Sequence, residues 1–134
     1  IRGIDRSEAV RLMNATPMPS REDEIREIRR VYGPTADGVI RAQEAFLDLD
    51  EEGYSRLQAR IADRWDEVQA ATATVPPADE VRQLLRQANL PTDPAEIHLT
   101  EEDVRDAILY GHYIRNPFTV IKLSRVLGIN WPGD

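Results

Sequence analysis

The chain has 134 residues, of which 41% are hydrophobic and 31% charged, so it is long enough for one globular domain with its own core. Its net charge of −7 weighs against a surface for nucleic acid or an anionic membrane, because both need clustered lysines and arginines. The absence of cysteine excludes disulfides, thiolate metal sites and cysteine nucleophiles. No apolar run is long enough to span a membrane and no signal-peptide pattern opens the chain, so we expect a cytoplasmic protein. Because it starts at Ile1 and not at methionine, we also expect a piece of a longer protein.

In the N-terminal half, residues that cap helices alternate with residues that end them. The expected helices begin at Asp5, Ser20, Thr35 and Asp50, and they end near Pro17, Gly33, Leu47 and Thr72–Thr74. The fourth has the clearest apolar stripe, at three-and-four spacing, made of Tyr54, Leu57, Ile61, Trp65 and Val68. Gln43 falls on the stripe of the third helix. Glu24 lies in the first turn of the second helix, where the helix dipole favours an acid.

The C-terminal half predicts further helices joined by short turns. Asp79 caps a helix whose apolar stripe consists of Val81, Leu84, Leu85 and Ala88, and Asn89 supplies its left-handed exit. Another turn starts at Asp93–Pro94. Thr100 and Asp103 cap the next helix, while Asn116 caps the last one, with Pro117 at its first position and Gly128 at its end. No stretch alternates with the period of a strand, so we expect an all-α fold, a bundle of six to eight helices forming a single domain over residues 1–134.

The helix that starts at Thr100 is apolar on nearly every side, which is typical of a helix buried among others, and we predict that it is the central helix. If it continues to Arg115, that side chain points inward and His112 lies at the border of the apolar face. Arg115 then forms a salt bridge or caps the last carbonyls, or it faces a phosphate or carboxylate in a cleft. A hydrogen-bonded core or surface histidine explains His112 better than a metal ligand, because no second ligand stands at helical spacing.

The sequence contains no motif for a self-sufficient active site. Gly33 and Gly38 are spaced as in a phosphate-binding loop, but the required lysine and hydroxyl residue do not follow. We therefore assign no catalytic, cofactor-binding or metal-binding residue to this chain. The run from Thr119 to Ile129 resembles the first helix and turn of a helix-turn-helix, but only five residues follow it, too few for a recognition helix.

The last third of the chain carries a family resemblance. The stretch LLRQANLPTDPAEIHLTEEDVRDAILYGHYIRNPFTVIKL resembles the C-terminal end of the AraM-type glycerol-1-phosphate dehydrogenases, within the superfamily of dehydroquinate synthases and iron-containing alcohol dehydrogenases. In that family a leucine-rich helix, a proline-containing turn and an acid-capped helix precede an ending Ile-Arg-x-Arg-Tyr-Thr. Ile114, Arg115, Phe118 and Thr119 fit this ending, whereas Pro117 stands where the family has its second arginine.

The resemblance implies a helical C-terminal lobe that walls the substrate cleft of a two-domain oxidoreductase. The partner would be an N-terminal dinucleotide-binding domain, and the parent enzyme would use NAD(P) and a divalent metal, neither of them held by this chain. Arg115 and His112 are the candidates for an interdomain or substrate-phosphate contact. The expected partners also include further copies of the chain in a homo-oligomer, but neither nucleic acid nor a membrane. The alternatives are a stand-alone helical adaptor for another protein and a truncated helix-turn-helix regulator.

Overall fold

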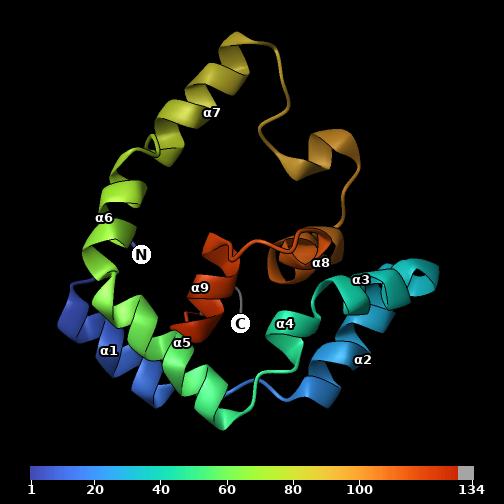
Figure 1. Cartoon of the computed structure of the whole chain (residues 1–134). Helices are drawn as coiled ribbons and strands as arrows, with labels where there is room; N and C mark the ends of the chain where they lie inside the picture. The colour runs from blue at the N-terminus through green and yellow to red at the C-terminus, as the bar shows by residue number, and fades with distance from the viewer. Residues whose placement is uncertain (130–134) are drawn as a thin grey trace.

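The computed structural model describes residues 1–129, and within this range the chain is entirely helical, without strands (Figure 1). The α-helices are α1 (Arg6–Ala15), α2 (Arg21–Tyr32), α3 (Ala36–Ala42), α4 (Glu44–Leu47), α5 (Glu51–Asp63), α6 (Trp65–Ala73), α7 (Ala78–Gln87), α8 (Glu101–Tyr110) and α9 (Val120–Val126). Short 3₁₀ helices are η1 (Gly33–Thr35), η2 (Pro94–Ile97) and η3 (Gly111–Ile114). Only one residue separates α3 from α4 and α5 from α6, so the described range contains seven helices when these are counted as continuous. The prediction of an all-α fold with six to eight helices is confirmed.

Most of the predicted helix starts are present because their caps act locally. The side chains of Asp5, Ser20, Asp50 and Thr100 each accept a hydrogen bond from a backbone N–H in the first turn of the helix that follows. Two predicted caps are wrong. Pro77 precedes α7 in place of Asp79, and Thr119 caps α9 in place of Asn116. Proline fixes an extended approach at the first site, and at the second the Thr119 hydroxyl accepts from the Lys122 N–H.

The main core lies where α1, α5, α6 and α9 meet. Its buried members are Ala9, Met13, Tyr54, Ile61, Trp65, Leu123, Val126 and Leu127. A second cluster joins α2, α3 and α4 to η3 through Ile28, Ala36, Leu47 and Tyr113. The stripe predicted on the fourth helix faces the main core, with Trp65 only 1% exposed and its indole N–H donating to the Ile4 carbonyl at 2.9 Å. The helix at the centre of the molecule is therefore α9 (Figure 1).

The prediction that the helix starting at Thr100 is central is wrong, because α8 contains no buried residue. Helix α8 ends at Tyr110, and the chain continues as the 3₁₀ helix η3. Because a 3₁₀ helix has fewer residues per turn, the side chains after Tyr110 point in other directions than they would in a continued α-helix. Only His112 and Tyr113, both in η3, are buried in this part of the chain. The apolar residues expected to surround one long helix are thus divided between a peripheral helix and a buried turn.

Helix α7 also departs from expectation. Its predicted apolar stripe does form one face of a ten-residue helix, but none of its side chains is buried. Val81 is 40% exposed and Leu84 is 55% exposed. Figure 1 shows α7 continuing beyond α6, away from the core, before the chain returns through η2 to α8.

The end of α9 is fixed by a close contact with the end of α1. Gly128 has φ +63°, and the Ile129 N–H donates to the Ser124 carbonyl at 2.9 Å, as the predicted glycine ending requires. A Cβ at position 128 would lie 2.2 Å from the Thr16 hydroxyl oxygen. Glycine is needed here both for its backbone conformation and for the space it leaves.

Candidate functional site

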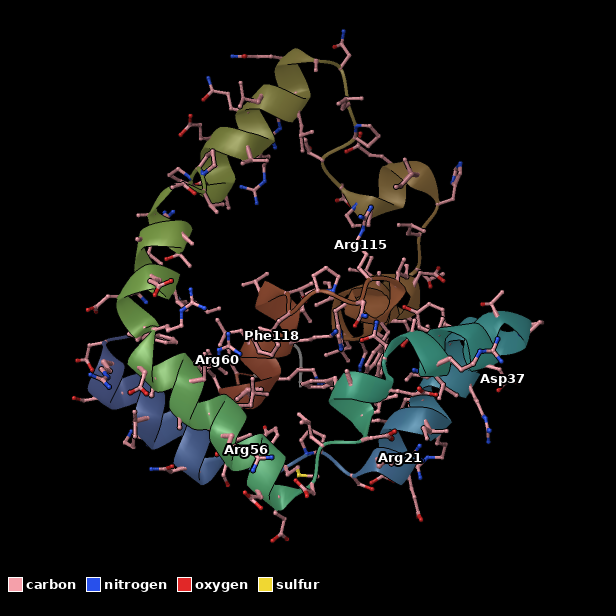
Figure 2. The ribbon with its side chains drawn as sticks, viewed as in Figure 1. Arg21, Asp37, Arg56, Arg60, Arg115 and Phe118 are labelled. Carbon is pink, nitrogen blue, oxygen red and sulfur yellow. The ribbon has the colours of Figure 1, made fainter. Side chains whose placement is uncertain are left out.

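The loop that joins η3 to α9, residues 115–119, presents Arg115 on the surface of the molecule. Its backbone is extended there, with φ −123° and ψ 137°, and its side chain is exposed. The predicted inward orientation is therefore wrong, because Arg115 lies beyond the end of α8 and not on its apolar face. No carboxylate within residues 1–129 pairs with the guanidinium, which projects from the loop (Figure 2). The expected salt bridge does not form in the described part of the chain, whereas a contact with an external anion remains open to this side chain.

Two buried polar side chains hold this loop in place. Gln43, between α3 and α4, donates from Nε2 to the Tyr113 carbonyl at 2.8 Å and to the Arg115 carbonyl at 3.0 Å. Lys122, on α9, donates from Nζ to the Asn116 carbonyl at 3.2 Å and to Gln43 Oε1 at 2.7 Å. Consecutive parts of the loop are thus tied to two different helices. The backbone under Arg115 is preorganised, while the guanidinium itself stays free.

Lys122 is unusual because it is 1% exposed and its ammonium group has no carboxylate partner among residues 1–129. Burial lowers the pKa of this lysine. Its partners are neutral oxygens, and the Phe46 ring lies 5.4 Å from Nζ. Our sequence reasoning missed both Lys122 and its contact with Gln43. The available signal was the position of each on an apolar stripe.

His112 is 3% exposed, and neither of its ring nitrogens has a hydrogen-bond partner in the described range. Its ring lies 4.0 Å, centroid to centroid, from that of Tyr113. Burial, followed by the positive charges of Arg125 and Lys122, lowers the pKa of His112 to about 3, so the imidazole is neutral near pH 7. Within residues 1–129, no three His, Asp or Glu side chains are grouped closely enough to hold a metal ion. His112 is thus a buried neutral group beneath the loop, and only Arg115 of the two predicted residues is open to an outside partner.

A partly buried ion pair joins α9 to α2. Arg125 of α9 donates to Glu24 of α2 and, at 3.1 Å, to the Tyr113 hydroxyl. Burial raises the pKa of Glu24 despite the opposing effect of Arg125. A cavity of about 20 Å³ next to Glu24 and Tyr54 has room for one water molecule. The helix dipole accounts for an acid at this position in the first turn of α2, but the Glu24 side chain also links α2 to α9 through Arg125.

Two larger hollows flank α9. One, of about 600 Å³, lies between α5–α6 and the start of α9. The other, of about 920 Å³, lies between α8 and α9, where Ile108, Leu109 and Ile121 contribute to an apolar lining. Neither brings together a nucleophile, a base and an orienting acid, so the chemistry offered by the described residues is binding.

Comparisons with protein-family models, with curated proteins and with solved structures found no match to this chain. None of the helices in the described range combines the length and the apolar character needed to cross a membrane. A recognition helix after Gly128, which the helix-turn-helix interpretation requires, would fall on residues 130–134, outside the described residues.

Proposed function

We propose that this chain is the helical lobe of a metal- and NAD(P)-dependent, glycerol-1-phosphate dehydrogenase-like oxidoreductase. The observation that carries the proposal is Arg115, which is exposed and unpaired within residues 1–129 while its backbone is fixed from below by Gln43. A guanidinium held in this way suits a phosphate group, with which it forms two parallel charge-assisted hydrogen bonds. The family resemblance, which includes Ile114, Arg115 and Thr119, supports the same substrate class.

In this proposal a dinucleotide-binding domain covers the apolar groove between α8 and α9. The groove is large, at about 920 Å³. Ile114, next to Arg115 in the chain and outside the groove lining, is 69% exposed and extends the apolar surface that the second domain would cover. Apolar surface of this kind is typical of docking faces, and closure of a second domain would exclude water around the arginine. In this proposal, as the family resemblance implies, the other domain holds the metal and the nicotinamide nucleotide. The part played by this lobe is to bind and orient the phosphate.

The test is made on the polypeptide encoded by the full reading frame, assayed for NAD(P)-dependent oxidation of glycerol 1-phosphate. Replacing Arg115 with alanine should raise the KM about 10- to 100-fold, because a hydrogen bond to a charged group contributes about 1.5–3 kcal/mol. R115K should recover part of the loss, and R41A, which removes another exposed arginine, should leave the KM unchanged. Absence of oxidation by the wild type would overturn the dehydrogenase assignment. Oxidation with an unchanged KM in R115A would overturn the role of Arg115.

A second candidate function, a stand-alone helical adaptor, is favoured by the exposed stripe of α7. An adaptor would bind its partner through this stripe and would need no nucleotide. The same assay separates the two candidates, because an adaptor gives no oxidation of glycerol 1-phosphate at any concentration of NAD or NADP.

A further inference from the structure

The hollow between α5–α6 and the start of α9 has a volume of about 600 Å³, within the range typical of pockets for small molecules. Most of its lining is apolar and comes from both walls: Leu57, Ile61, Val68, Ala71, Phe118, Val120 and Leu123. The polar part of the lining consists of Arg60, Arg64, Glu67, Thr72 and Thr119. This α5–α6–α9 hollow shares only Val120 with the groove between α8 and α9, so the two are separate sites.

Contacts behind the lining hold both walls of the hollow in place. The loop before α9 is tied to that helix by the buried ammonium of Lys122. Phe118 is 45% exposed, but its ring packs edge to face against that of Phe46, with the centroids 6.5 Å apart. Ile61 of α5 and Leu123 of α9 both belong to the main core, which joins one wall to the other. The hollow is therefore part of the folded chain and does not need a ligand to form it.

The charged side chains of the lining leave one positive charge without a partner. Arg64 donates from Nε to Glu67 Oε1 at 3.0 Å, so these two charges neutralise each other. Arg60, near the end of α5, has no carboxylate partner within residues 1–129. Figure 2 shows Arg60 on the side of α5 that faces α9, where Phe118 also lies. The hollow thus combines an apolar surface with a single unpaired guanidinium.

An elongated apolar molecule with one negative charge matches this combination. Its hydrocarbon chain would lie on the apolar lining, because each methylene removed from water is favourable. Its carboxylate would pair with Arg60, since a guanidinium binds a carboxylate through two parallel hydrogen bonds. A phosphate or a dicarboxylate would find no second unpaired cation among the described residues of the lining.

We propose that the α5–α6–α9 hollow binds monocarboxylates with an unbranched alkyl chain, the chemical class of the free fatty acids. The alkyl chain lies between α6 and Phe118, and the carboxylate lies at Arg60. This binding does not depend on the dehydrogenase-like function, because it uses neither Arg115 nor the groove between α8 and α9.

Calorimetric titration of the 134-residue chain with dodecanoate, kept below its critical micelle concentration, tests the proposal. A one-to-one complex is expected, and the Kd should fall about two- to fourfold for each methylene added between octanoate and dodecanoate. Dodecyltrimethylammonium, which has the same alkyl chain and the opposite charge, should bind at least about tenfold more weakly. The net charge of the chain is −7, so a preference for the anion requires a local positive group.

Two matched pairs of variants locate the site. A71W places a large side chain in the hollow and should raise the Kd at least about tenfold, whereas A70W, at an exposed position one residue away and outside the lining, should leave it unchanged. R60E should reverse the preference between the two amphiphiles. R41E, which makes the same change of charge at an exposed position outside the hollow, should not. All four variants should keep the far-UV circular dichroism spectrum of the wild type.

No binding of dodecanoate at about 1 mM would overturn the proposal. So would equal affinity of the wild type for the two amphiphiles, or an unchanged preference in R60E. Amide chemical shifts of the wild type give a readout that needs no substitution: dodecanoate should shift the signals of α5, α6 and residues 118–123 most strongly. Shifts confined to α8 and the first helix would place the ligand in the other groove and would also overturn the proposal.

Discussion

Replacing Gln43 with leucine should strongly destabilise the protein, because this side chain connects two helices to the Arg115 loop. It is fully buried and takes part in three hydrogen bonds, with the Tyr113 and Arg115 carbonyls and with the Lys122 ammonium. Two neutral hydrogen bonds at about 1 kcal/mol each and one to a charged group at about 2 kcal/mol give a loss of roughly 4 kcal/mol. The largest share comes from Lys122, which would remain buried without its closest acceptor.

A double-mutant cycle isolates that share. In Q43L/K122M both polar groups are replaced by apolar ones, so the cost of a buried, poorly solvated ammonium disappears. We expect the double variant to be roughly 1–2 kcal/mol more stable than the sum of the two single variants predicts. Urea unfolding at pH 7, followed by circular dichroism at 222 nm, gives each free energy of unfolding. If Q43L costs less than about 1 kcal/mol, or if the two changes are additive, Gln43 and Lys122 do not act as a unit.

Three further predictions concern stability. G128A should destabilise the protein by at least about 2 kcal/mol, because alanine disfavours the positive φ at this position and its methyl would meet the Thr16 hydroxyl. G38A adds a methyl in open space on a helix and should stabilise the protein by about 0.5–1 kcal/mol. Equal effects of the two substitutions in urea unfolding would refute this. The pKa of His112 is about 3 in the folded protein and about 6.5 in the unfolded chain. Between these pH values only the unfolded state binds the proton, so the free energy of unfolding is highest above pH 6.5 and falls as the pH drops toward 3. The loss at pH 5 is about 2 kcal/mol, and H112L should remove this slope from unfolding curves recorded between pH 7 and pH 5. R125M should cost about 3–5 kcal/mol at pH 7 because it leaves the Glu24 carboxylate buried without its partner. This loss of stability should be smaller at pH 4, where Glu24 is protonated. If thermal unfolding shows that R125M loses the same stability at pH 7 and at pH 4, the ion pair does not explain the effect.

The helix boundaries could be read from the sequence where the controlling residues are close neighbours. Asp5, Ser20, Asp50 and Thr100 cap as expected because each cap needs only a backbone N–H three residues away. The same local reasoning failed at Asn116, where proximity of a proline suggested a helix start. In the structure the Asn116 carbonyl instead accepts a hydrogen bond from the Lys122 side chain at 3.2 Å.

The position of each helix relative to the core was much harder to infer. Apolar residues surrounding α8 suggested a central helix, and the clean stripe of α7 suggested a buried face. Periodicity shows that a helix has an apolar side, but it does not show whether another element covers that side. In this fold α9 occupies the centre although it has only seven residues, and α7 remains exposed.

The sequence by itself determined that the chain is all-helical within residues 1–129 and where most of these helices start and end. These properties depend on contacts within a few residues. Only the tertiary structure decided that Gln43 reaches Lys122, 79 residues away, and that Glu24 meets Arg125, 101 residues away. The burial of a polar side chain is favourable only when a partner is brought to it, and the partner arrives through packing of distant helices. For this reason, the apolar stripes on which Gln43 and Lys122 lie did not reveal that these two side chains hold the Arg115 loop.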